Sequence, residues 1–214
     1  MSVPLEALLS ELGGATESLW TRLAPDAGQM RRRVLFTAPE PGAGTTLLAA
    51  VVAWELSQNL RQRTVLVEAN LRRPALAAYL GLGKVQGLSD VLDGRAELTG
   101  CRLTLPQAKG LEVLTAGTPR APVPGELVTP AAREVLVELA READVLLIDA
   151  PALSEGPETR LLFDQVDGVV LVLRARRTAK ADAKRAASQV AAAGLPILGA
   201  IFNRYRPEVN WPRT

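Results

Sequence analysis

The residues with the clearest chemical potential in this sequence are 37–46, TAPEPGAGTT, which have the types and spacing of a phosphate-binding loop. Gly42 and Gly44 let the backbone curl so that successive N–H groups point inward, and a helix that begins directly after the loop adds the positive end of its dipole. Thr46 stands where a hydroxyl would hold Mg²⁺. The lysine that reaches the terminal phosphates in such loops is replaced by Thr45. The pattern therefore predicts a phosphate site with a weakened hold on its ligand.

The loop departs from the usual motif at a second position, because Pro39 stands where the motif opens with a small residue. The alternative interpretation is a glycine-rich strand-to-helix turn that binds nothing. The loop follows a short apolar run and opens a long apolar helical segment, which is the context that a phosphate loop requires. Backbone N–H groups do not depend on the replaced side chains, so a weak phosphate site can persist. The candidate phosphate contacts are Gly42, Ala43, Gly44, Thr45 and Thr46.

Acidic residues follow two further apolar runs. Glu68 ends one of them, with Asn70 shortly after it, and Asp149 ends the other. An acid at the carboxyl end of a buried strand beside a phosphate loop holds Mg²⁺ and its waters in P-loop proteins. Thr46, Glu68 and Asp149 are therefore the candidate metal ligands. A helix cap or a solvated loop residue is the alternative for Asp149.

Arginines stand near the same predicted strand ends. Arg72 and Arg73 come shortly after Glu68, and Arg72 is the candidate substitute for the missing lysine charge. The alternative for both is an exposed surface pair. A second group, at 174–177, follows another apolar run on the same expected sheet edge. It would add positive potential toward an anion or an acidic partner, or else form a solvated loop.

The elements that must position these residues alternate between strands and helices. Short apolar runs, rich in β-branched residues and free of charge, are typical of parallel strands covered on both faces. Thr129-Pro130 gives one helix a capping hydroxyl followed by proline at the first helical position. We predict an α/β fold with a doubly wound, mostly parallel sheet and helices on both faces. The predicted strands are 34–36, 65–67, 111–114, 145–148, 169–173 and 197–202, and the predicted helices are about 45–60, 130–142, 157–165 and 179–193.

Length and composition exclude several kinds of chemistry. The chain has 214 residues, a net charge of +2, no His and one Cys, which rules out a Ser-His-Asp triad, His metal ligands and a disulfide framework. Aromatic residues make up 4%, too few for a nucleic-acid stacking platform. No apolar run reaches the roughly 18 residues of a membrane span. We expect a cytoplasmic protein that reaches the inner membrane only peripherally, through a partner.

Three parts are expected along the chain. Leucines at helical spacing predict a helical extension over residues 1–28, and its short apolar stripe should dock on the domain or on a partner. Residues 29–206 form the predicted P-loop domain, and residues 207–214 form a C-terminal tail.

Further motifs follow in order: GLSDVL at 87–92, a strand and loop ending in Ala-Gly at 111–117, a Pro-rich loop at 119–127, VDGV at 166–169 and a Gly-x-x-x-Asn-Arg segment at 199–204. With the phosphate loop and the strand-end acids, they make residues 17–206 resemble the cytoplasmic domain of bacterial tyrosine kinases of capsule and exopolysaccharide systems. That family lies within the MinD/ParA-like deviant P-loop ATPases. The resemblance implies a P-loop NTPase fold, ATP or ADP with Mg²⁺ as cofactors, and Asn203 as an adenine contact.

The sequence departs from this family at the positions that carry its chemistry. Thr45 removes the phosphate lysine, Glu68 lengthens the first acid, Asn70 removes the charge of the second, and only Asp149 is retained. The tyrosine-rich tail is absent, and the oligomerisation motif survives only in part, at 17–22. The resemblance therefore implies a pseudokinase with weak or lost nucleotide binding and no confidently assigned catalytic residue.

Its implied task is to regulate or scaffold polysaccharide synthesis and export. The implied partner is a membrane-anchored polysaccharide co-polymerase or export protein, alongside a homo-oligomer. A weakly active ATPase or tyrosine kinase that uses Arg72 is the first alternative. A MinD/ParA-like positioning ATPase is the second.

Overall fold

The computed structural model describes residues 32–120 and 123–205. The predicted helical extension and the predicted C-terminal tail lie outside the described residues. Within the described part, no helix combines the length and the apolar character needed to cross a membrane.

A seven-stranded sheet forms the centre of the molecule, in the order β3-β4-β2-β5-β1-β6-β7. Every neighbouring pair is parallel except β3 with β4. This arrangement confirms the predicted doubly wound, mostly parallel α/β fold. The strands are β1 (Arg32–Thr37), β2 (Thr64–Glu68), β3 (Leu103–Thr104), β4 (Leu111–Leu114), β5 (Val145–Asp149), β6 (Gly168–Arg174) and β7 (Ile197–Asn203).

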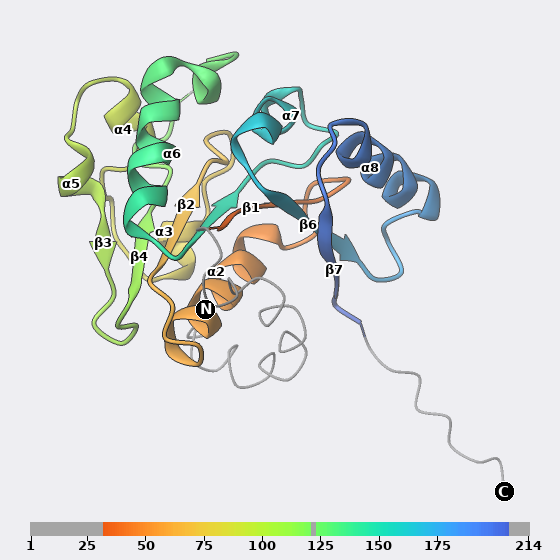
Figure 1. Cartoon of the computed structure of the whole chain (residues 1–214), viewed down its shortest axis with the longest axis horizontal. Helices are drawn as coiled ribbons and strands as arrows, with labels where there is room; N and C mark the ends of the chain where they lie inside the picture. The colour runs from red at the N-terminus through yellow and green to blue at the C-terminus, as the bar shows by residue number, and fades with distance from the viewer. Residues whose placement is uncertain (1–31, 121–122, 206–214) are drawn as a thin grey trace, which may run out of the picture.

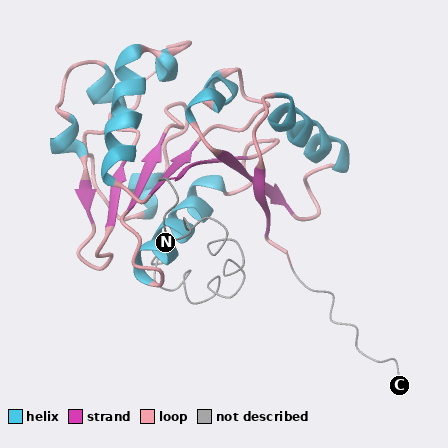
Figure 2. Cartoon of the chain, in the orientation of Figure 1, coloured by secondary structure: helices cyan, strands magenta, loops and turns pink. Residues whose placement is uncertain are grey.

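Helices cover both faces of this sheet (Figures 1 and 2). Because side chains alternate across each strand, Leu35 and Ile148 pack into one apolar core beneath the long helices α6 and α8. Val34 and Leu147 pack into a second core beneath α2. The helices are α2 (Thr45–Gln58), α3 (Leu76–Tyr79), α4 (Leu88–Leu92), α5 (Leu98–Cys101), α6 (Pro130–Glu142), α7 (Glu158–Leu161) and α8 (Lys180–Ala192).

The sequence patterns predict the long elements correctly and the short ones poorly. Thr129 caps α6 as predicted, since its side chain accepts the Ala132 N–H at 3.3 Å. The helix expected at 157–165 is instead two pieces, α7 and a 3₁₀ turn at Phe163–Gln165. The two-residue strand β3 and the short helices α3, α4 and α5 were not predicted, because each is too short to show a period.

Glu68 ties three elements together at the end of β2. It is completely buried, and its Oε1 accepts the N–H groups of Ala75 at 2.5 Å and Leu76 at 2.8 Å, where α3 begins. Its Oε2 accepts the Ala116 N–H, just beyond β4, at 3.0 Å. Burial raises the pKa of Glu68, and the three N–H donors oppose that rise. The carboxylate thus serves as a backbone brace.

We expect Glu68→Ala to lower the free energy of unfolding by about 3 kcal/mol or more, because it leaves three backbone donors without their acceptor. Glu134→Ala, on the exposed side of α6, is the matched control and should change stability by less than about 0.5 kcal/mol. Urea unfolding of both variants measures the difference. Equal stability of the two variants would contradict the bracing role.

Candidate functional site

The predicted phosphate loop lies between β1 and α2, at the carboxyl edge of the sheet. Gly42 and Gly44 have φ angles of 80° and 90°, a left-handed region that favours glycine. Thr45 is the first residue of α2, no side chain caps this helix, and its first turn holds no acid. The positive end of α2 and its first N–H groups therefore face the loop, with no acid in the first turn of the helix.

Asn203, at the end of β7, holds the loop in place. Its Nδ2 donates to the Ala43 carbonyl oxygen at 2.7 Å, and its Oδ1 accepts the Arg204 N–H at 2.8 Å. A Cβ at position 44 would meet the Asn203 amide nitrogen and push it away from the Ala43 carbonyl, so the absence of a side chain at Gly44 keeps this bond in place. The resemblance assigned Asn203 to the adenine base, and that role stays a prediction. Its contact with the loop was not predicted.

Asp149 lies at the end of β5, aligned with Phe36 of β1 and with Glu68 of β2. It is completely buried, and neither carboxylate oxygen has a hydrogen-bond partner of acceptable geometry. Burial raises the pKa of Asp149 to about 8, and the neighbouring Glu68 adds to the rise. The Thr46 hydroxyl is near enough to oppose this shift, although it does not reach hydrogen-bonding geometry. When Asp149 is ionised, its two oxygens are therefore hydrogen-bond acceptors that no described group uses.

The other predicted positions are engaged in structural contacts. Both oxygens of Glu68 bind backbone N–H groups, so its role as a metal ligand stays a prediction and would need those bonds to be shared or broken. Asn70 accepts the Arg73 N–H at 3.2 Å and closes the turn after β2. Neither side chain has an open acceptor comparable with those of Asp149.

Arg72 and Arg73 are ion-paired with the segment after β5. Arg72 lies 3.1 Å from Glu158, and Arg73 lies 3.3 Å from Glu155. These two acids were not singled out in the sequence, because nothing local connects them to residues more than 80 positions earlier. The role of Arg72 as a substitute for the missing lysine stays a prediction, and its charge is already partly neutralised by Glu158.

The residues present fit a nucleotide phosphate and Mg²⁺ in part. The backbone of 42–46 and the start of α2 suit a phosphate, and Thr46 with Asp149 supplies a hydroxyl and an acid where Mg²⁺ would stand. No lysine reaches this place from position 45. The described residues contain no cluster of three or more potential metal ligands among His, Cys, Asp and Glu.

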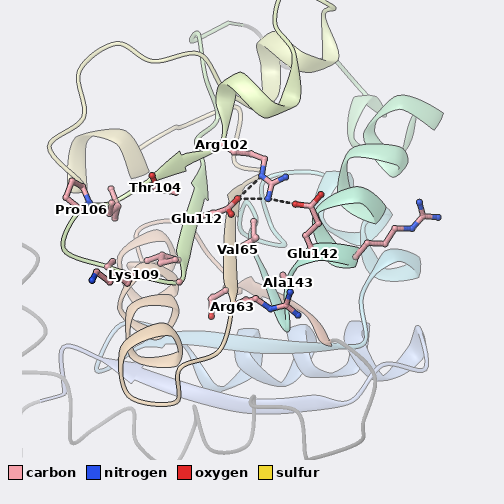
Figure 3. Close-up of a pocket in the computed structure, with 15 residues that line it drawn as sticks. Arg63, Val65, Arg102, Thr104, Pro106, Lys109, Glu112, Glu142 and Ala143 are labelled. Atoms are coloured by element: carbon pink, nitrogen blue, oxygen red, sulfur yellow. Dashed lines mark hydrogen bonds and ion pairs between the residues drawn. The ribbon is translucent and has the colours of Figure 1, made fainter.

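A hollow of about 730 Å³ lies elsewhere, on residues near the amino ends of β2 and β5 and around β3 and β4 (Figure 3). Arg102 is central to it and pairs with both Glu112 and Glu142 at 2.6 Å. Arg63, on its wall, pairs with Asp144 at 2.6 Å. These charges satisfy one another and lie at the opposite edge of the sheet from the phosphate loop. The hollow therefore takes no part in the phosphate site.

Comparison with known proteins gives bacterial tyrosine-protein kinases among the relatives. No family model matches the sequence. The chain is 30% identical to the tyrosine-protein kinase YwqD of Bacillus subtilis over 173 residues, which cover 80% of this chain and 72% of YwqD. It is 26% identical to the putative tyrosine-protein kinase CapB of Staphylococcus aureus, over 84% of this chain and 78% of CapB.

A solved structure agrees with these relatives. The kinase domain of VpsO superposes with a TM-score of 0.85 at 27% identity, and the match covers 94% of this chain and 98% of that domain. Sequence and fold therefore lead to one assignment: the chain belongs to the family of bacterial tyrosine-protein kinases.

Proposed function

We propose that this chain is a degenerate member of its family, a pseudokinase that regulates or scaffolds bacterial polysaccharide synthesis and export. The observation that carries the proposal is Thr45, which occupies the lysine position at the first residue of α2 in a loop whose backbone geometry is otherwise suited to phosphate. The architecture is kept while the main charge of the site is missing.

The physics of phosphoryl transfer supports this reading. Such catalysis depends on neutralising charge and on positioning, with little covalent chemistry from the protein. Loss of one charge-assisted bond costs about 1.5–3 kcal/mol of binding, and more in the transition state. Arg72 would have to break its ion pair with Glu158 before it could take the place of the missing lysine. The loss of that pair opposes the replacement.

One observation favours a second candidate, a weakly active ATPase or tyrosine kinase. Asp149 keeps two buried oxygens without partners beside Thr46, which is where a hydrated Mg²⁺ would be held. A bound ATP would supply the terminal phosphoryl group that is transferred. Backbone groups of the loop would bind it, and Thr46 and Asp149 would orient the ion.

The partner in this proposal is a membrane-anchored polysaccharide co-polymerase or export protein. Support comes from the names of the relatives, which include the putative tyrosine-protein kinase EpsB of Ralstonia solanacearum, and from the resemblance to capsule and exopolysaccharide kinases. In the same proposal the protein is cytoplasmic and reaches the membrane through that partner.

Titration of the full chain with ATP and ADP, with and without Mg²⁺, tests nucleotide binding. We expect weak or undetectable heat, since neither Thr45 nor Asn70 supplies the charge found at these positions in the family. Incubation with labelled ATP should leave Tyr205 unmodified. Submicromolar affinity, or label that disappears in Tyr205→Phe, would favour the active-enzyme candidate instead.

Thr45→Lys should restore a contact with the phosphates. The new charge-assisted bond is worth about 1.5–3 kcal/mol, which corresponds to roughly ten- to a hundredfold tighter ATP binding. Thr45→Gln, similar in length but uncharged, is the control and should gain much less. If Thr45→Lys folds normally and its affinity stays at the wild-type level, the loop is no longer a phosphate cradle and the protein acts purely as a scaffold.

The pH dependence of stability should report Asp149. Its pKa is about 8 in the folded protein against an ordinary value of 3.8, so between these pH values the folded state binds a proton that the unfolded state has released. Stability contributed by this group is full below about pH 4 and is lost as the pH rises toward 8. Asp149→Asn should flatten this decline in urea unfolding, whereas Asp164→Asn, at an exposed position, should not. Identical slopes for wild type and Asp149→Asn would contradict the raised pKa.

A further inference from the structure

Positive charge is concentrated in one part of this molecule. Residues 168–205, which contain β6, α8 and β7, carry seven basic residues and one acidic residue, a net charge of +6 in a chain whose total is only +2. The one acid, Asp182, is already paired with Arg185 of the same helix. The rest of the chain therefore has a net charge of −4.

Four of these basic residues gather where β6 and β7 end and α8 begins. We call them the basic rim: Arg174, Arg177, Lys180 and Arg204. Arg174 is aligned with Asn203, the residue before Arg204, and Lys180 is the first residue of α8, which lies beside these strands (Figure 1). Within the part of the chain that the structure describes, no acid forms an ion pair with any of the four.

The rim borders an edge strand that is unusually apolar. Among the described strands β6 is the only neighbour of β7, whose seven residues, ILGAIFN, include no charge and no proline. Phe202 is 62% exposed and Ile197 is 39% exposed. The opposite edge, β3, is only two residues long. Proteins normally protect long edge strands with charges, proline or a cover, because unpaired backbone groups attract another strand.

The backbone groups that β7 offers outward can be identified. Ala175 N–H donates to the Asn203 carbonyl, which fixes Asn203 as a residue that faces β6. Hydrogen-bonding direction alternates along a parallel strand, so Ile201 also faces β6. Ala200 and Phe202, in between, therefore direct their N–H and C=O groups away from the sheet. A partner strand would find its donors and acceptors at these two residues.

We propose that β7 and the basic rim form a docking site for an extended acidic segment of another protein. The segment adds a strand beside β7, places apolar side chains near Ile197 and Phe202, and brings carboxylates to the rim. Strand addition of this kind takes affinity from main-chain bonds and specificity from side chains. Ala200, Phe202 and the four rim residues are not among those assigned to nucleotide binding, so failure of this docking would leave the proposed pseudokinase standing.

Charge and hydrogen bonding favour this partner over two others. A second copy of the chain would bring the same excess of positive charge to the same edge, which is repulsive. An anionic membrane would suit the rim, but hydrocarbon cannot satisfy the outward N–H and C=O groups of Ala200 and Phe202. An acidic strand meets both requirements.

Fluorescence anisotropy with the full chain tests the proposal. The probe is a labelled peptide of alternating valine and glutamate, about eight residues long and blocked at both ends, and its valine–lysine counterpart is the control. We expect saturable binding of the acidic peptide that weakens with added salt. No binding, or equal binding of both peptides, would overturn the proposal.

Two variants locate the site. Ala200→Pro removes an outward N–H without touching the β6 ladder, and should weaken peptide binding about tenfold or more while the circular dichroism spectrum is unchanged. Arg177→Gln with Lys180→Gln should weaken it similarly and reduce its salt dependence. Lys84→Gln with Lys109→Gln removes two exposed charges elsewhere and should have little effect. If Ala200→Pro does not fold, the paired charge variants still decide the outcome.

Sedimentation tests the two other possible occupants of the site, an anionic membrane and a second copy of the chain. The acidic-segment proposal expects a protein that stays in the supernatant with phosphatidylglycerol vesicles and whose oligomeric state is the same in wild type and Ala200→Pro. Pelleting with the vesicles without peptide binding, or a dimer that Ala200→Pro dissociates, would overturn it in favour of a membrane or a second copy.

Discussion

The carboxyl edge of this sheet must accommodate two buried carboxyl groups at the ends of adjacent strands. Glu68 and Asp149 are aligned across β2 and β5, and both are completely removed from water. A buried acid is tolerated when hydrogen bonds compensate for its lost hydration. Glu68 has three backbone donors, and Asp149 has none. One acid therefore stabilises the fold, while the other is left as an unsatisfied group beside the phosphate loop.

The shape of the phosphate loop and its capacity for phosphoryl transfer depend on different residues. The loop depends on left-handed glycines and on the start of α2, which are backbone properties that survive when Thr45 replaces a lysine. Phosphoryl transfer depends on side-chain charge, which a single replacement removes. In the proposed pseudokinase the shape of the loop is therefore kept although the lysine charge is not.

Local pattern predicted the strands, the long helices and the phosphate loop, because each has a period or motif within about 15 residues. It did not predict the contacts that decide what each site residue does. Glu68 binds Ala116, Arg72 pairs with Glu158, and Asn203 binds Ala43, and each partner lies more than 45 positions away in the sequence.

The bond between Asn203 and Ala43 has a consequence for how the chain becomes functional during its synthesis. It joins residues 160 positions apart, so the loop leaves the ribosome well before the strand that carries Asn203. Closing so long a loop delays the contact relative to local helix formation. The phosphate loop of a nascent chain would thus lack this brace until β7 has been synthesised, although its glycines and the start of α2 are already present.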